Sequence, residues 1–225
     1  DRTPREKIDA EVLELEKAGC KLSLGDTYLD DLQADLVFRT PGMHPEKPEL
    51  VALREAGAEV TSEMEVFFSL CPCTTIAVTG SDGKTTTTTL IAEMLKAAGK
   101  TVWLGGNIGT PLLPLLDEMQ DEDFAVVELS SFQLMDMTRS PSRALVTNLA
   151  PNHLDVHKDM DEYVEAKTNI FRYQDENGAG SGVCQHNKKA WPRVQKVHQI
   201  VCWIRGRILP GIFRRTDEYI QKVQL

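Results

Sequence analysis

A glycine-rich stretch that ends in a lysine and a row of threonines has the clearest chemical signature in the sequence. Residues 80–87 read GSDGKTTT. Glycines at this spacing let several backbone N–H groups point at one spot, where a phosphate group can bind. Lys84 would add a mobile cation, and the hydroxyl of Thr85 suits a phosphate-bound magnesium ion. The predicted nucleotide phosphate site consists of Gly80, Ser81, Asp82, Gly83, Lys84, Thr85 and Thr86.

The residues on either side of this stretch favour the same interpretation. Residues 75–78 form a short apolar run, and residues 84–98 repeat apolar residues at helical spacing. In the order strand, glycine loop, helix, a phosphate lies at the positive end of the helix dipole. The longer motif GxxxxGK[ST] would need a glycine where Val78 stands, so only GxxGKT is present. The alternative is a turn whose glycines serve only the backbone angles.

Two residues at or just beyond the carboxyl ends of predicted strands could hold metal ions. Residues 124–129, FAVVEL, indicate a buried strand with Glu128 near its carboxyl end, where NTPases hold magnesium directly or through water. His153 follows a second predicted strand at residues 144–150 and could be a metal ligand. The alternatives are a solvated carboxylate and a histidine that only makes hydrogen bonds. The phosphate loop one crossover away favours the metal role for Glu128.

A lysine interrupts the apolar face of a predicted helix. Residues 159–173 have helical periodicity, and the neighbours of Lys167 three and four positions away include Tyr163 and Ile170. A lysine in this position either extends its amine to solvent or is desolvated and loses its proton more easily. A neutral amine can act as a nucleophile or take up carbon dioxide as a carbamate.

Composition and charge narrow the function classes. The 225 residues are 41% apolar, which is enough for one large domain or two small ones. A net charge of −9 argues against a general nucleic-acid surface, and no apolar run approaches the roughly 18 residues that span a bilayer. Five cysteines fit a reducing cytosol. Cys71 and Cys73 are too close for the usual CxxC metal knuckle, so a metal or redox role is disfavoured.

Helical and extended patterns alternate along the chain, which predicts parallel sheets covered by helices. Helices are expected over residues 5–18, 49–56, 63–70, 84–98, 111–119 and 159–173, and extended segments over 21–24, 35–39, 58–61, 75–78, 101–104, 124–129, 144–150 and 197–204. Ligands bind such sheets at the carboxyl ends of strands. Asp1 with Arg2, and the turn Thr40, Pro41 and Gly42, are therefore candidates, with ordinary turn chemistry as the alternative.

With these residues in hand, the sequence resembles the Mur ligases from residue 1 to about residue 174. Five segments make the resemblance: GSDGKTTT at 80–87, GGNIGTP at 105–111, ELSSFQL at 128–134, TNLAPNHLDVH at 147–157 and EAK at 165–167. The phosphate loop marks a superfamily that includes the folylpolyglutamate synthetases. ELSSFQL together with GGNIGTP is similar to the branch that adds D-glutamate, and no feature for pterin recognition is found.

The resemblance implies an ATP-dependent amide ligase of peptidoglycan precursor synthesis. ATP would phosphorylate the carboxylate of UDP-N-acetylmuramoyl-L-alanine, and the amine of D-glutamate would attack the acyl phosphate. By the same resemblance, Lys84 would hold the ATP phosphates, Thr85 and Glu128 a first Mg²⁺, His153 a second Mg²⁺, and Lys167 would be carbamylated beside a metal. Asn107, Ser130 and Gln133 would line the substrate site, and Asp1, Arg2, Thr40, Pro41 and Gly42 would lie in the UDP-binding domain.

The implied fold is α/β, with a Rossmann-like UDP-binding domain over residues 1–70 and a P-loop-type central domain over residues 71–225. Relative to the family, the first strand and a C-terminal domain are missing, and Asn152 replaces an acidic residue that commonly precedes the histidine. We expect a cytoplasmic monomer without nucleic-acid or membrane partners, inactive or nearly so as this chain alone. The alternative is a catalytically silent nucleotide-binding module.

The pattern is lost from residue 178 onward, where basic and aromatic residues mix without a nucleic-acid module signature. Residues 178–225 are therefore expected to be divergent and a candidate for disorder. Our hypothesis for this abrupt loss is a disturbed reading frame or a chimeric gene.

Overall fold

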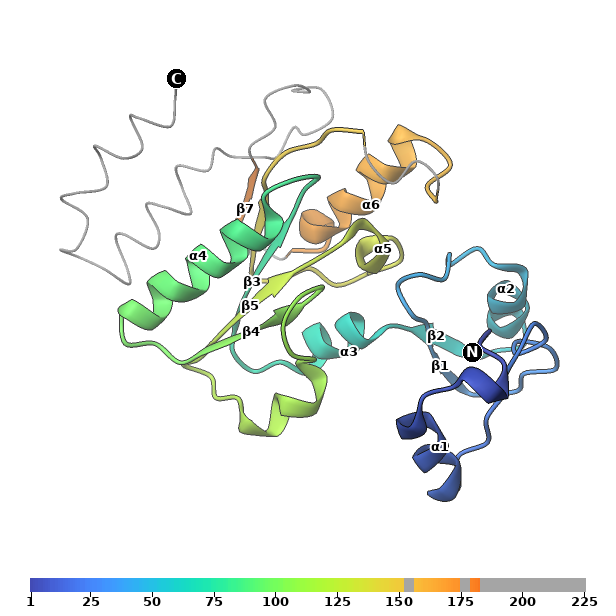
Figure 1. Cartoon of the computed structure of the whole chain (residues 1–225). Helices are drawn as coiled ribbons and strands as arrows, with labels where there is room; N and C mark the ends of the chain where they lie inside the picture. Colours follow the sequence, from blue (N-terminus) through green and yellow to red (C-terminus); the bar gives the residue numbers. More distant parts are fainter. Residues whose placement is uncertain (152–155, 175–178, 183–225) are drawn as a thin grey trace. The chain divides into compact units, whose positions relative to one another are not determined.

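Two parallel sheets organise the residues that the structure, a computed structural model, describes: 1–151, 156–174 and 179–182 (Figure 1). They belong to two units, one of Asp1–Arg39 with His44–Thr61 and one of Thr40–Met43 with the chain from Ser62 onward. The boundary falls ahead of helix α3 (Glu63–Leu70), whereas the sequence analysis drew it after residue 70.

The first unit contains a two-stranded parallel sheet of β1 (Leu36–Phe38) and β2 (Glu59–Thr61), with α2 (Pro48–Glu55) between them in the chain. These three elements were predicted. The single helix predicted over residues 5–18 is wrong: a 3₁₀ turn, η1 (Arg5–Lys7), is followed by α1 (Ala10–Lys17). Asp9, a residue type favoured at helix starts, adopts extended backbone there and restarts the helix. Residues 21–24 form no strand.

The second unit contains a five-stranded parallel sheet in the order β4-β5-β3-β6-β7. Its strands are β3 (Thr74–Thr79), β4 (Val102–Gly106), β5 (Phe124–Glu128), β6 (Arg143–Val146) and β7 (Ala179–Gly182). Val78 pairs with Glu128 on one side, and Thr79 pairs with Val146 on the other. The carboxyl ends of three neighbouring strands therefore meet where the phosphate loop begins.

Helices cover both faces of this sheet, as Figure 1 shows. On one face, α4 (Lys84–Ala97) packs Ile91 and Leu95 against Ile76 and Val78 of β3. On the other face lies a larger apolar cluster around Ala77, with residues from α3, α5 (Ser131–Leu134) and α6 (Met160–Arg172). Successive residues of β3 point to opposite faces, so this central strand is buried on both sides, as its apolar sequence indicates.

Three elements of this unit differ from the predictions. Residues 113–118 form a 3₁₀ helix, η2 (Leu113–Glu118), in place of the predicted helix over 111–119. The strand predicted over 144–150 ends at Val146, because the residues that follow bond to the phosphate loop. The short helix α5 was not predicted, and β7 lies within residues 178–225, which are expected from the sequence to be divergent. The strand predicted over 197–204 lies outside the described residues.

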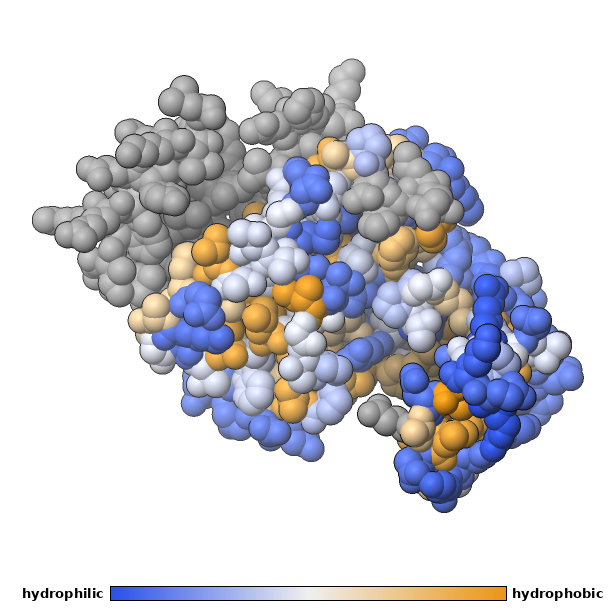
Figure 2. Space-filling view, viewed as in Figure 1, coloured by the Kyte–Doolittle hydropathy of each residue, from blue (hydrophilic) through white to orange (hydrophobic). Residues whose placement is uncertain are grey.

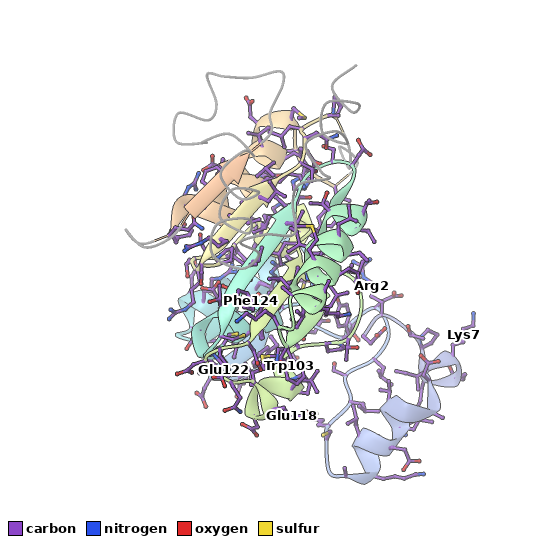
Figure 3. All side chains as sticks on the ribbon, turned by 90° about the vertical axis from the view of Figure 1, so that its left-hand side faces the viewer. Arg2, Lys7, Trp103, Glu118, Glu122 and Phe124 are labelled. Carbon is purple, nitrogen blue, oxygen red and sulfur yellow. The ribbon has the colours of Figure 1, made fainter. Side chains whose placement is uncertain are left out.

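The amino ends of the strands are closed by polar contacts far from the phosphate loop. The Trp103 indole N–H donates to an oxygen of Asp123 at 2.9 Å, and the Gln120 N–H donates to the same oxygen at 3.1 Å. Figure 3 shows Trp103, Glu118, Glu122 and Phe124 gathered at this end of the sheet. On the face that carries α4, hydrophilic and hydrophobic residues are interspersed (Figure 2), and Leu90 is 57% exposed.

None of the helices in the described part of the chain has the length and hydrophobicity needed to cross a bilayer.

The contact between β4 and β5 gives a testable prediction. Gly106 has φ 96°, and an added Cβ would lie 2.2 Å from the Glu128 carbonyl oxygen, so Gly106→Ala must move the two strand ends apart. Gly99→Ala is the matched control, because Gly99 has φ 74° with nothing within 4 Å of its added Cβ. Both variants share a left-handed strain of about 1–2 kcal/mol.

We expect Gly106→Ala to lower the urea midpoint clearly more than Gly99→Ala, measured by circular dichroism. Equal losses in the two variants would contradict the close approach of β4 to Glu128.

Candidate active site

Helix α4 begins without any of the groups that usually satisfy a helix start. Its N-cap is Gly83, with φ 75° and no side chain, and its first turn has no acidic residue but begins with Lys84. By contrast, α3 and α6 are capped by Ser62 and Asp159 and have acidic residues in their first turns. The first backbone N–H groups of a helix lack partners within the helix. The start of α4 therefore has the charge and the donors to bind an anion.

Two lysine amines converge on one backbone carbonyl in this loop. Lys84 Nζ donates to the carbonyl oxygens of Gly80 and Ser81 at 3.1 and 2.9 Å. Lys167 Nζ, from α6, donates to the same Gly80 oxygen at 3.0 Å and to Thr79 Oγ1 at 3.2 Å. The two amines therefore lie close together and donate to uncharged acceptors. An anion that bound here would reduce the repulsion between their positive charges.

Lys167 is buried, which decides between the two alternatives that its place in the apolar helix face left open: the amine is not extended to solvent. The side chain is 1% exposed, and its amine lies 4.7 Å from the centre of the Tyr163 ring. Burial, reinforced by the charge of Lys84 and opposed by that of Glu128, lowers the pKa of Lys167 to about 7. A large fraction of this amine is therefore neutral near pH 7.

Glu128 links the loop helix to two strands. It is 1% exposed, which excludes the alternative of a solvated carboxylate. Thr85 Oγ1 donates to Glu128 Oε2 at 2.7 Å, and Asn107 Nδ2 donates to Oε1 at 2.9 Å. Hydroxyl and carboxylate oxygens are the hard ligands that magnesium prefers, usually together with phosphate oxygens. The pair Thr85 and Glu128 thus fits a phosphate-bound magnesium ion.

The described residues contain no cluster of three or more His, Cys, Asp or Glu side chains that could hold a metal ion by themselves. A magnesium ion at Thr85 and Glu128 would therefore need further oxygen ligands, such as those of a nucleotide.

The phosphate loop is clamped by residues that the sequence analysis did not single out. Asn148 Oδ1 accepts hydrogen bonds from the N–H groups of Ser81 and Asp82 at 3.1 and 2.8 Å. Thr147 Oγ1 donates to the Asp82 carbonyl at 2.6 Å and lies 1.9 Å from where a Cβ on Gly80 would stand. Gly80 is therefore required for close approach. The sequence signal that could have identified Thr147 and Asn148 is their position directly after a strand, β6.

A second set of contacts ties the loop to α6. Ser81 Oγ bonds to the Tyr163 hydroxyl at 2.9 Å and donates to the Ala150 carbonyl at 2.8 Å. Tyr163 is one turn before Lys167 on the same helix and is 1% exposed. From the sequence, Tyr163 is expected only to be an apolar neighbour of Lys167. In the structure it fixes the distance between the loop and the Lys167 amine.

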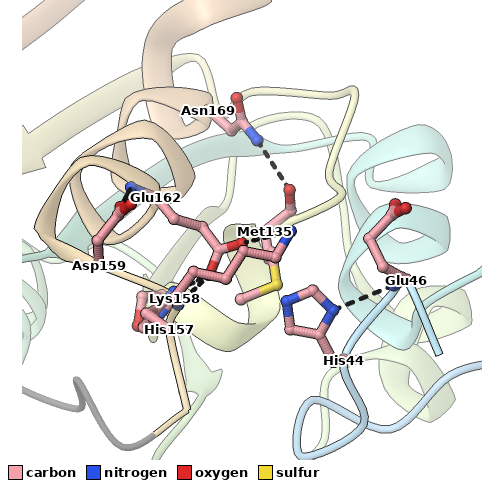
Figure 4. Close-up of polar contacts among 9 residues, drawn as sticks. His44, Glu46, Met135, His157, Lys158, Asp159, Glu162 and Asn169 are labelled. Atoms are coloured by element: carbon pink, nitrogen blue, oxygen red, sulfur yellow. Dashed lines mark hydrogen bonds and ion pairs between the residues drawn. The ribbon is translucent and has the colours of Figure 1, made fainter.

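The start of α6 is itself fixed by a polar cluster, shown in Figure 4. Asp159 Oδ1 accepts from the Glu162 N–H at 2.8 Å, and the Glu162 carboxylate lies 3.4 Å from both Lys158 Nζ and His157 Nδ1. His157 Nε2 is 2.9 Å from Ser131 Oγ, which connects α6 to α5. These contacts fix the residue at which α6 begins. They therefore fix the position of Lys167 relative to the start of that helix.

The remaining predicted site residues are placed as follows. Ser130 and Gln133 form a capping box at α5, with Gln133 Oε1 accepting from the Ser130 N–H at 2.9 Å. Asp1 takes part in turn contacts, since its amine donates to the Ser23 carbonyl at 2.8 Å, and Arg2 is exposed. Both lie in the first unit, whereas the turn at residues 40–42 groups with the second. His153 and Asn152 lie outside the described residues.

The low pKa of Lys167 predicts a specific dependence of stability on pH. Between about pH 7 and its ordinary value of 10.5, the unfolded chain binds a proton that the folded chain does not. Lys167 therefore costs stability in full below pH 7, and the cost shrinks as the pH rises through this window, by up to about 1.4 kcal/mol per unit.

Lys167→Met should remove this dependence. Its free energy of unfolding relative to the parent, from urea titrations, should fall as the pH rises above 7. Parallel pH profiles for the parent and Lys167→Met would show that the amine has an ordinary pKa.

Comparison with known proteins agrees with this geometry. The Mur ligase middle domain matches residues 78–202. The UDP-N-acetylmuramoylalanine--D-glutamate ligase of Acetivibrio thermocellus is 59% identical over 175 residues, covering 77% of this chain and 38% of that protein. The ligase of the same name from Clostridium botulinum strain Hall is 56% identical over 178 residues, covering 79% and 39%. This chain thus spans about two fifths of the length of these relatives.

Among solved structures, the UDP-N-acetylmuramate:L-alanyl-gamma-D-glutamyl-meso-diaminopimelate ligase from Neisseria meningitides aligns with a TM-score of 0.47 and 19% identity. The alignment covers 82% of this chain and 63% of that one.

The domain match extends over more than half of the sequence, from the last residues of β3 through the phosphate loop and α6. The chain therefore belongs to the Mur ligase family.

Proposed function

We propose that this chain is the nucleotide-binding part of an ATP-dependent ligase that joins D-glutamate to UDP-N-acetylmuramoyl-L-alanine in peptidoglycan precursor synthesis. The observation that carries the proposal is the convergence of Lys84 and Lys167 on the Gly80 carbonyl beside the Thr85 and Glu128 pair. The choice of D-glutamate is supported by the two relatives, which share 56–59% of their residues with this chain over the matched segment.

Binding of the ATP phosphates would use charge and backbone donors together. Lys84 would exchange its bonds to the Gly80 and Ser81 carbonyls for bonds to phosphate oxygens, at the helix start where the N–H groups of α4 are free of side-chain caps. Asn148 and Thr147 would keep the loop in this shape. Carboxylate and phosphate repel each other, so such fixed positive groups would account for much of the acceleration.

Magnesium would be held by Thr85 and Glu128, with the Asn107 amide orienting the carboxylate. When bound, the ion would supply neutralisation of phosphate charge. His153, which lies outside the described residues, is proposed as the ligand of a second magnesium ion on the strength of the family resemblance.

We propose that the Lys167 amine reacts with carbon dioxide to form a carbamate. An amine with a pKa of about 7 is substantially neutral under ordinary conditions, and only the neutral amine adds to carbon dioxide. The product would be an anion facing Lys84, so the pair of like charges at Gly80 would become a pair of opposite charges. Lys167 would then serve as a further oxygen ligand for a metal ion.

The substrate contacts stay proposals that rest on the family resemblance. Asn107, Ser130 and Gln133 would face the acceptor, and Asp1, Arg2 and the turn at residues 40–42 would bind the UDP group. We propose a monomer, with ATP and Mg²⁺ as cofactors. The second candidate is a catalytically silent nucleotide-binding module that keeps the phosphate loop without a complete active site.

The nucleotide site is tested by Lys84→Ala. Loss of two charge-assisted hydrogen bonds to phosphate, each worth about 1.5 kcal/mol or more, should weaken ATP binding about 100-fold in calorimetric titrations with Mg²⁺. Lys96→Ala is the control, because Lys96 is an exposed lysine at the other end of the same helix, paired with Glu93. An unchanged affinity of Lys84→Ala for ATP would contradict the proposal that the nucleotide binds at this loop.

The ligase reaction is tested by transplanting the matched segment of 175 residues into the Acetivibrio thermocellus relative. If the residues of this chain are competent, the chimera should release phosphate only when both UDP-N-acetylmuramoyl-L-alanine and D-glutamate are present. Lys167→Ala in the chimera should reduce turnover severely. A folded chimera that binds ATP without acceptor-dependent phosphate release would favour the silent module.

A further inference from the structure

Two cysteines in the second unit lie against each other at a point remote from the phosphate loop. Cys71 follows α3, where its N–H donates to the Phe67 carbonyl at 2.8 Å, and Cys73 directly precedes β3. Their sulfur atoms are 3.3 Å apart. We propose that Cys71 and Cys73 form a thiol–disulfide exchange site, which a small aliphatic disulfide oxidises to a bond within the chain.

The geometry favours bond formation in place. A disulfide needs a sulfur–sulfur distance of about 2.05 Å, so the two atoms must approach by roughly 1.3 Å, within the reach of side-chain rotation. Both ends are held, since Cys73 is 5% exposed within the same apolar cluster as Phe67. Pro72 between them has a fixed φ, which limits the conformations that separate the sulfurs.

The two thiols are suited to different steps of the exchange. Cys71 is half-buried, whereas Cys73 is buried, so an external disulfide reaches Cys71 first. The Cys73 thiol, by hydrogen bonding to the Cys71 sulfur, lowers the pKa of Cys71. A lower pKa raises the fraction of thiolate, which is the attacking form.

The thiol–disulfide exchange takes two steps, over which electrons and protons balance. The Cys71 thiolate attacks a disulfide RSSR, forming a mixed disulfide with Cys71 and releasing RS⁻. Cys73 then loses its proton and attacks the Cys71 sulfur, forming the Cys71–Cys73 bond and releasing a second RS⁻. The two thiols lose two electrons, RSSR gains them, and the two thiol protons are taken up by the released RS⁻ groups.

A metal site is the weaker explanation for the same pair. Structural zinc needs four ligands, and among the described residues no group of three or more His, Cys, Asp or Glu side chains is placed to hold an ion. The sulfur–sulfur distance of 3.3 Å suits the proposed redox chemistry, which the sequence spacing alone had disfavoured.

The test uses the full chain with its three other cysteines, Cys20, Cys184 and Cys202, changed to serine. After incubation with oxidised glutathione under native conditions, the intact mass should fall by two hydrogen atoms, and dithiothreitol should restore it. Both thiols should become resistant to alkylation together. Unchanged circular dichroism before and after oxidation verifies that the bond forms in the folded chain.

Two matched variants identify the steps. In the same background, Cys73→Ser should stop at one glutathione added to Cys71, and Cys71→Ser should react much more slowly because Cys73 is buried. The proposal is overturned if the parent pair stays unreacted, if it retains glutathione without forming the internal bond, or if the bond appears only after unfolding.

Discussion

Two amines that share one carbonyl oxygen are the interaction on which the rest of the site depends. Lys84 reaches Gly80 from the start of α4, and Lys167 reaches it from the middle of α6. Like charges this close in a buried place are unfavourable unless one is neutral or an anion joins them. Burial lowers the pKa of Lys167 to about 7, which favours the first solution, and the proposed ATP phosphates would be the second.

The sheet provides this convergence through its register. Because β3 lies between β5 and β6 in a parallel sheet, the carboxyl ends that carry Thr79, Glu128 and Thr147 are brought to one edge. The chain leaves β3 through Gly80, where Thr147 leaves no room for a side chain. The same edge therefore supplies the carboxylate proposed to bind magnesium, the loop clamp and the acceptors for both amines.

Local sequence patterns predicted the elements that form the site. The contacts that depend on pairing between distant segments could not be predicted from them. The order strand, loop, helix and the place of Lys167 on the apolar helix face follow from short-range periodicity, whereas the burial of its amine was one of two alternatives that the sequence left open. The clamp by Asn148 depends on which strand lies beside β3, and that choice is made by tertiary packing. The contact between Cys71 and Cys73 depends on how α3 turns into β3, so spacing rules for metal knuckles could not detect it.

A crystal structure with a non-hydrolysable ATP analogue and Mg²⁺ tests most directly whether the start of α4 is an anion site. We expect the terminal phosphates within hydrogen-bonding distance of Lys84 Nζ and of the first N–H groups of α4, with the metal ion between Thr85 and Glu128. A triphosphate bound elsewhere, with Lys84 still bonded to the Gly80 and Ser81 carbonyls, would contradict this expectation.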